Sequence, residues 1–191
     1  MAVRFTLTKI IPSVLIYGSL IAAAMAVDVV LHLARLFSVG RYLGIAGTFV
    51  IVASFLYSLR KRKIVGFGAP KRLLQAHELL GWLGALMILV HGGIHFNAFL
   101  PWLALIAMMV VVASGLTGKF LLQGARESLR VRAADLLGTG LEPADLEREL
   151  LAHSLLVDTM KHWRKVHMPL TMVFTGLATI HVVATLFLWR W

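Results

Sequence analysis

The histidines are the residues of this sequence best suited to chemistry. Eight histidines occur among 191 residues, and there is no cysteine. The lack of cysteine excludes disulfides, thiolate-bound iron–sulfur clusters, CxxCH attachment of haem and cysteine zinc sites. Any metal chemistry therefore depends on histidine, methionine or carboxylate ligands.

Four of the histidines form two pairs with the same spacing. His77 and His91 are 14 residues apart, and so are His167 and His181. On an α-helix this spacing places two rings roughly 21 Å apart on nearly the same face. His153 also precedes His167 by 14 residues, but it lies in a polar stretch. Two pairs within apolar segments indicate a built site more strongly than one pair does.

The elements that must position these pairs are membrane-spanning helices. The chain is 59% hydrophobic and 15% charged. Crossing a bilayer takes about 20 apolar residues. Five stretches qualify: residues 10–34, 42–59, 73–96, 100–122 and 167–189. We predict an all-α fold, a single bundle of five transmembrane helices in a lipid bilayer.

Glycine and proline mark the joints between these stretches, at residues 39–40, 66–70 and 97–101. The first stretch has the basic start of a signal peptide, but its apolar run is too long for one, so we expect it to be retained. Residues 123–165 carry leucines among charges and are predicted to form short amphipathic helices in a cytoplasmic connector.

The basic residues predict the orientation, because positively charged loops stay in the cytoplasm. All but three of the 19 lysines and arginines lie in the N-terminus, residues 60–72 or residues 119–165. The N-terminus is therefore predicted to be cytoplasmic, in the cytoplasmic membrane of a bacterium or archaeon. The net charge of +10 does not indicate nucleic acid, because the basic residues lie at the ends of apolar segments.

The predicted third and fifth helices run in the same direction, so their histidines face each other at equal depths. His77 opposes His167 near the cytoplasmic side, and His91 opposes His181 near the outer side. Two imidazoles on opposite sides of a porphyrin make a six-coordinate iron suited to electron transfer. We therefore predict two haem b groups and no catalytic residues. His95 is an alternative to His91 as the outer ligand.

Three further residues are candidates for haem contacts. Arg72 and Arg164 lie near the predicted cytoplasmic end, where they can neutralise haem propionates or simply anchor the helices. Phe174 lies midway between the two histidines of its helix. It is placed to separate two haems, or it is ordinary packing.

Carboxylates beside or within the apolar stretches are candidates for proton or quinone chemistry, because ionisable groups in a membrane are costly. Asp28 is followed at i+4 by His32 on the same helix face. The two residues suit a proton path, a quinone-binding edge or a propionate contact, and they also suit a self-satisfied polar cluster. Glu78 suits a cytoplasmic quinone site or an interfacial position.

The two His-x13-His pairs, His77 with His91 on the third helix and His167 with His181 on the fifth, resemble the transmembrane domain of the ferric reductase and NADPH oxidase superfamily. The resemblance covers residues 72–189. It implies two b haems that carry electrons from cytoplasmic NADPH, through a flavin, to an outer acceptor. It also implies an aromatic residue between the haems, near Phe174.

No flavin or nicotinamide domain is recognisable beside these helices. Residues 66–68 and 138–140 each have Gly-x-Gly, but neither completes a dinucleotide-binding fingerprint. We therefore expect the chain to be an electron-transfer subunit of an oxidoreductase, supplied by a separate cytoplasmic flavoprotein or iron–sulfur subunit.

Two other functions stay open on the sequence alone. The first is a quinone-reactive cytochrome b that anchors a respiratory complex. Cytochrome b of quinol-oxidising complexes has the same 14-residue spacing, but on its second and fourth helices. The second is a haem-free membrane scaffold or transporter whose histidines carry protons or metal. The broken helices and inverted repeats of transporters are not evident in the sequence.

Overall fold

The computed structural model describes residues 2–94, 99–122, 130–131, 134 and 163–188. Regular secondary structure in these residues is helical throughout. The helices are α1 (Ala2–Leu33), α2 (Phe37–Ser54), α3 (Leu56–Lys61), α4 (Pro70–Ile94), α5 (Phe99–Thr117), the π-helix η1 (Gly118–Leu122) and α8 (Trp163–Leu188). The predicted all-α class is confirmed for the described part of the chain.

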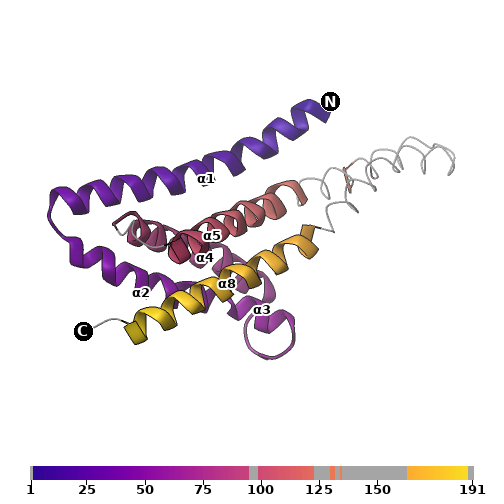
Figure 1. Ribbon diagram of the computed structural model, residues 1–191. Helices are drawn as coiled ribbons and strands as arrows, with labels where there is room; N and C mark the ends of the chain where they lie inside the picture. Colours follow the sequence, from indigo (N-terminus) through magenta and orange to yellow (C-terminus); the bar gives the residue numbers. More distant parts are fainter. Residues whose placement is uncertain (1, 95–98, 123–129, 132–133, 135–162, 189–191) are drawn as a thin grey trace.

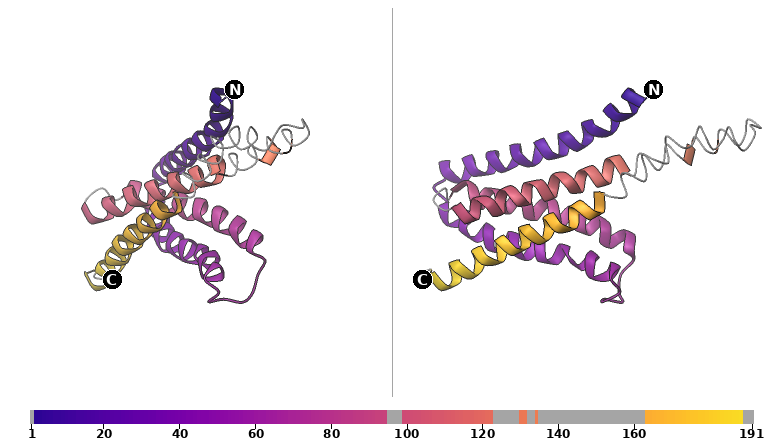
Figure 2. Two further views of the ribbon diagram at one scale, coloured as in Figure 1. Left: turned by 90° about the vertical axis from the view of Figure 1, so that its right-hand side faces the viewer. Right: turned by 45° about the vertical axis from the view of Figure 1, so that its right-hand side comes forward.

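Successive long helices run in opposite directions (Figure 1). The start of α1, the loop after α3 and the end of α5 lie at one end, which we call the N-terminal end. The turn after α1 and the last residues of α8 lie at the other, the C-terminal end, as the right view of Figure 2 also shows. The histidine-bearing helices α4 and α8 therefore run in the same direction, as predicted.

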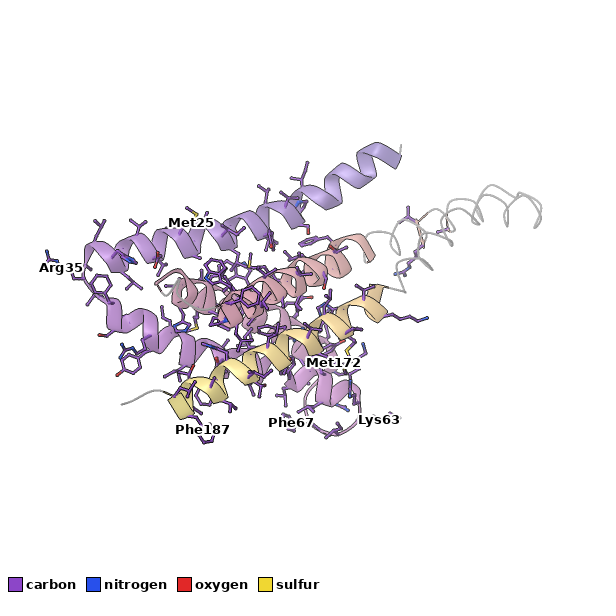
Figure 3. All side chains as sticks on the ribbon, in the orientation of Figure 1. Met25, Arg35, Lys63, Phe67, Met172 and Phe187 are labelled. Carbon is purple, nitrogen blue, oxygen red and sulfur yellow. The ribbon has the colours of Figure 1, made fainter. Side chains whose placement is uncertain are left out.

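The five long helices have the length and composition of membrane spans. Segments long and apolar enough to cross a membrane are Ile11–Leu33, Phe37–Lys61, Pro70–Gly93, Phe99–Phe120 and Lys165–Leu188. Large apolar side chains such as Met25, Met172 and Phe187 are exposed and point away from the bundle in Figure 3. Soluble monomers rarely expose extensive apolar surface. These features are those of an integral membrane protein.

The centre of the bundle is α4, which contacts α1, α2, α3 and α5, whereas α8 packs mainly on α5. One buried cluster contains Leu20, Ala85, Met108 and Phe174, from four different helices. Where α2 crosses α4, a Cβ added to Gly47 would lie 3.2 Å from the carbonyl oxygen of Gly84. A Cβ added to Gly84 would likewise lie 3.2 Å from the carbonyl oxygen of Gly47. Helix backbones approach this closely only where side chains are absent.

The turn between α1 and α2 differs from the prediction. The sequence predicts a joint at Gly40 and a second helix from Tyr42, but α2 begins at Phe37 and includes Gly40. The chain turns earlier, at Arg35, whose φ of 56° is left-handed. Gly40 is buried, and its carbonyl accepts a hydrogen bond from His91. This glycine provides close packing and does not break the helix.

The other joints follow the predicted turn chemistry more closely. Gly68, in the loop before α4, has a φ of 84°, which glycine adopts without strain. Pro70 is the first residue of α4, a position where a missing N–H breaks no helical hydrogen bond. Pro101 lies in the first turn of α5, which begins at Phe99, so this proline belongs to the helix and not to the joint.

Three other predicted boundaries need comment. The first helix begins at Ala2, earlier than predicted. The predicted helix over residues 100–122 has its last turn wound as η1. The connector predicted for residues 123–165 lies mostly outside the described residues, and α8 already begins at Trp163.

Candidate functional site

The inward face of α8 carries both of its predicted ligands. Residues that are buried or half-buried recur every three or four positions, which is the pattern of one helix face turned toward a bundle. This stripe consists of His167, Leu170, Thr171, Phe174, Leu177, Ala178, His181, Ala184 and Thr185. The two histidines therefore lie on one face, as their spacing predicts, with buried Phe174 midway between them.

Both histidines of α4 donate hydrogen bonds to the backbone of α2. The Nδ1–H of His77 donates to the carbonyl oxygen of Ser54 at 2.9 Å, and the Nδ1–H of His91 donates to that of Gly40 at 3.0 Å. A carbonyl oxygen only accepts, so Nδ1 must carry the proton in both neutral rings. Nε2 then carries the lone pair, which is the arrangement of a metal-binding histidine with its supporting hydrogen bond.

His167 on α8 is held by a hydroxyl from α5. Its Nδ1 lies 2.5 Å from the Oγ of Ser114, which also lies 3.0 Å from the carbonyl oxygen of Val111. When the hydroxyl proton goes to Val111, Ser114 accepts a hydrogen bond from the Nδ1–H of His167, and Nε2 carries the lone pair. Three of the four predicted ligands thus have Nδ1 hydrogen-bonded to a group of another helix.

The pair at the C-terminal end has the separation that a shared metal requires. The ring centres of His91 and His181 are 6.5 Å apart, and the ring planes are inclined by 48°. Two imidazoles on opposite sides of one metal ion have ring centres about 6.4 Å apart, because each metal–nitrogen bond is about 2.0 Å and each nitrogen lies about 1.2 Å from its ring centre. The 6.5 Å separation is compatible with ligation of one metal ion by both rings, and their pairing as ligands stays a prediction.

The pair at the N-terminal end lies at the matching depth on the same two helices. His77 and His167 are close enough for their imidazoles to interact electrostatically. The ring of Tyr57, on α3, lies 5.7 Å from the ring of His77. Each histidine on α4 thus has a counterpart on α8.

A partly open apolar cavity of about 180 Å³ lies between α2, α4 and α8. Side chains from both α4 and α8 border this space, and the two helices make few direct contacts in the described residues. Its walls are Thr48, Ile51, Val52, Phe55, Ile88, Phe174, Thr175, Ala178, Thr179, Val182 and Val183. On α8 the lining runs from Phe174 to Val183, past the depth of His181, and none of the four predicted ligands lines the cavity.

The threonines of this cavity present methyl groups to it. The hydroxyls of Thr48, Thr175 and Thr179 each donate to the carbonyl oxygen four residues earlier, at 2.7 to 2.8 Å. A hydroxyl satisfied within its own helix leaves the other face of the side chain apolar. The site therefore suits a flat hydrophobic group.

Glycines near the histidines fall into two classes. A Cβ on Gly44 would lie 2.6 Å from the ring of His91, so this glycine makes room for the imidazole. Gly84, Gly92 and Gly93 likewise contact neighbouring helices. Gly81 and Gly176, in contrast, have no atom within 4 Å of where a Cβ would be.

Taken together, these residues fit a porphyrin iron held by two imidazoles. A porphyrin supplies four of the six iron ligands, so the protein needs to supply only two. The described residues contain no cluster of three or more histidine, cysteine, aspartate or glutamate side chains that could hold a metal ion by themselves. The paired imidazoles are the candidate metal centre in this part of the chain.

The intramembrane carboxylate Asp28 lies on α1 beside α4. The Nδ1–H of His32 donates to the backbone carbonyl of Asp28 at 3.0 Å, and the same nitrogen is 3.5 Å from Oδ1. The buried Oδ1 has no hydrogen-bond partner in the described structure. The predicted Asp28–His32 cluster is therefore formed, but it does not fully satisfy the carboxylate.

The remaining predicted site residues differ in what surrounds them. Glu78 forms an ion pair with Lys119 of η1, with 2.6 Å between Oε2 and Nζ. Arg72 is exposed at the start of α4. The side chain of Arg164 and all of His95 lie outside the described residues. The alternative in which His95 is the outer ligand therefore stays a prediction.

The sequence did not indicate the groups that orient the rings. Two of them are backbone carbonyls, at Gly40 and Ser54, which have no sequence signature. Ser114 offered a weak signal as a small polar residue in an apolar helix. Lys119 is 41 positions from Glu78, and nothing in the sequence pairs them.

Comparison with protein families, with curated proteins and with solved structures gave no match for this chain. The geometry of the chain's own residues is therefore the basis for inferring its function.

Proposed function

We propose that this chain is a di-haem b membrane cytochrome, a subunit that carries electrons across the bilayer between a cytoplasmic redox partner and an outer acceptor. The observation that carries the proposal is that His77, His91 and His167 are each held at Nδ1 by a group of another helix. His77 and His91 donate Nδ1–H to backbone carbonyls of α2, which places the lone pair on Nε2, and Nδ1 of His167 is hydrogen-bonded to Ser114 of α5. Histidines that only filled space would not need this support at matching depths.

On this proposal His77 and His167 hold one haem and His91 and His181 hold the other. When bound, haem b supplies one-electron oxidation and reduction at its iron. The polypeptide supplies ligands, spacing and insulation. The 14-residue spacing sets the two sites roughly 21 Å apart along the helices, enough to span most of a core about 30 Å thick.

The apolar cavity beside α8 supports this arrangement, because a macrocycle needs a dry and mostly apolar environment. Phe174 is buried between the depths of the two pairs. It is placed to exclude water and lipid from the space between the two haems. Gly81 and Gly176 leave space on the two ligand helices.

The orientation proposed here puts the N-terminal end in the cytoplasm, because most lysines and arginines lie at that end. The pair His77 and His167 is then the entry point for electrons from a cytoplasmic flavoprotein or iron–sulfur subunit. His91 and His181 face the outer acceptor. Orientation is measurable by protease access to a tag placed before α1 in closed vesicles.

The first experiment is a reduced-minus-oxidised visible spectrum with pyridine haemochrome quantification of the purified full-length chain. We expect two b haems per chain. His91→Ala and His77→Ala should each leave one haem, and the exposed controls Met172→Ala and Leu79→Ala should leave two. A chain that keeps its helicity but contains no haem would refute the proposal.

A ligand exchange tests the assignment more sharply. His181→Met replaces one imidazole with a thioether that also binds haem iron, and His/Met ligation raises the reduction potential. We expect the variant to keep two haems, with one potential raised and one unchanged. Two unchanged potentials would show that His181 is not a ligand.

A further inference from the structure

Asp28 occupies a position in α1 that is otherwise apolar. The face of α1 turned toward α4 carries Leu20, Ala24 and Leu31, all of which are buried. Asp28 falls on the same face, four residues after Ala24, and its side chain is 26% exposed. Its Oδ1 is buried without a hydrogen-bond partner in the described structure. A carboxylate in this position is expensive unless it is protonated or receives a ligand.

The described neighbours of Asp28 come from α4 and from its own helix. From α4, the backbone of Gly93 faces Asp28, with 3.3 Å from its Cβ position to the carboxylate carbon. From α2, Phe37 packs edge-on against His32, with ring centres 5.4 Å apart. His32 lies on the same helix as Asp28 and is 47% exposed. In the described residues Gly93 of α4 contacts Asp28 and Phe37 of α2 contacts His32, so His32 is the titratable neighbour that the structure describes for Asp28.

Gly93 also locates the carboxylate relative to the candidate haem site, because it follows His91 by two residues on α4. Outside the contact, Val29, Val30 and Leu33 are exposed apolar residues of α1. A ligand that reaches Asp28 must therefore be soluble in lipid. It must also carry an oxygen that exchanges protons, since an anionic ligand such as a propionate would repel the carboxylate.

We propose that Asp28 and His32 form the proton-exchanging edge of a quinone site at the C-terminal end of the bundle. The proposal rests on the function proposed above and names its outer acceptor as a quinone. A quinone combines a lipid-soluble ring with carbonyl oxygens that accept hydrogen bonds from a protonated carboxyl. His32, half exposed at the end of α1, connects Asp28 to water.

The reaction balances with protons taken from the aqueous phase. Reduction of a quinone to the hydroquinone takes two electrons and two protons, and forms two O–H bonds. The electrons come one at a time from the cytoplasmic donor through the cytochrome. Asp28 in its protonated form gives one proton to the nearer quinone oxygen and is reprotonated through His32. Water supplies the second proton, and oxidation of the hydroquinone is the reverse.

The test measures binding of the short-chain quinone ubiquinone-1 to the purified full-length chain by titration calorimetry. We expect Asp28→Asn to weaken binding about 10-fold or more, as loss of a hydrogen bond from a carboxyl group requires. Asp28→Glu should restore binding. Ser19→Ala, at an exposed α1 hydroxyl bonded to its own helix, is the control and should not change it.

Infrared difference spectra of the oxidised and reduced chain give a second readout. We expect a protonated-carboxyl C=O band that changes on quinone reduction, shifts in D₂O and disappears in Asp28→Asn. A carboxylate with a purely structural role would give no such band. Haem content is measured in the same samples, so absence of haem refutes the cytochrome separately from the quinone site.

Two results would overturn the quinone site: no binding of ubiquinone-1 to the native chain, or equal binding by Asp28→Asn. If Asp28→Asn does not fold, Gly93→Ala replaces it. The added methyl would lie 3.3 Å from the carboxylate carbon and shift it by a few tenths of an ångström, while the Asp28 and His32 side chains are both retained. Binding unchanged in that folded variant would equally refute the proposal.

Discussion

The two helices that carry the histidine pairs share one spacing but differ in how they are packed. α4 is surrounded by α1, α2, α3 and α5, and both of its rings are fixed by the backbone of α2. α8 lies at the side of the bundle, packs mainly on α5, and has His167 fixed by the Ser114 hydroxyl. One ligand helix is thus part of the core, and the other closes the site from outside.

The two helices that supply the ligands of one site, α4 and α8, therefore need not be equally ordered before the ligand binds. The rings on α4 are set by backbone atoms that no substitution removes. The position of α8 depends on fewer contacts, so binding of haem should order α8 more than α4. If α4 is fixed before haem binds and α8 is not, changes to the two helices and to the groups that hold their rings should have different effects.

The largest effect is expected in hydrogen exchange of the haem-free and haem-loaded chain. When the haem concentration is about 100 times its Kd, binding lowers the population of the open state of the segment that closes on haem by about 100-fold, and amide exchange in that segment slows by the same factor. We expect this protection in the amides of α8, and less than about 10-fold in α4. Equal protection of the two helices, measured by mass spectrometry of peptides, would show that haem binding does not order α8 more than α4.

A smaller effect is expected when the ring of His91 is displaced. Gly44→Ala places a methyl 2.6 Å from that ring, and overpacking of this kind costs about 2 kcal/mol, or roughly a 30-fold loss of haem affinity. Haem titration should show the loss at one of the two sites. Gly18→Ala, at an exposed glycine with nothing within 4 Å, is the matched control. Retention of both affinities in Gly44→Ala would show that the ring can move without cost.

Removal of the hydroxyl that orients His167 should have a moderate effect. Ser114→Ala leaves the Nδ1–H without this acceptor, and loss of such a supporting group lowers metal affinity about 10-fold. The site of His77 and His167 should weaken while the other is unchanged, as measured by haem titration with one site blocked at a time, in His91→Ala and in His77→Ala. Equal weakening of both sites would mean that Ser114 only stabilises the fold.

The smallest effect is expected from the ion pair between Glu78 and Lys119. The side chains are 29% and 38% exposed, and pairs of this kind contribute less than about 1 kcal/mol. Glu78→Gln should therefore change thermal stability little and leave both haems bound. A large loss of stability would show that this pair fixes η1 against α4.

The sequence predicted the features that depend on periodicity. The five long helices, the inward positions of His167 and His181 and the parallel course of α4 and α8 follow from apolar length and 14-residue spacing. The prediction was wrong at Gly40, because glycine ends helices in water but provides close contact between membrane helices. The supporting hydrogen bonds were not predictable, because two of their acceptors are backbone atoms. The haem groups themselves stay a prediction.

The peripheral position of α8 has a consequence for how the protein is made. The chain leaves the ribosome from its N-terminus, so α1 to α5 are complete while residues 123–162 are still being added. At about 5–20 residues per second, that stretch takes roughly 2 to 8 s. During this interval the histidine face of α4 has no opposing helix. Biosynthesis itself thus provides a period in which a large planar molecule can enter sideways, before the last helix arrives and covers it.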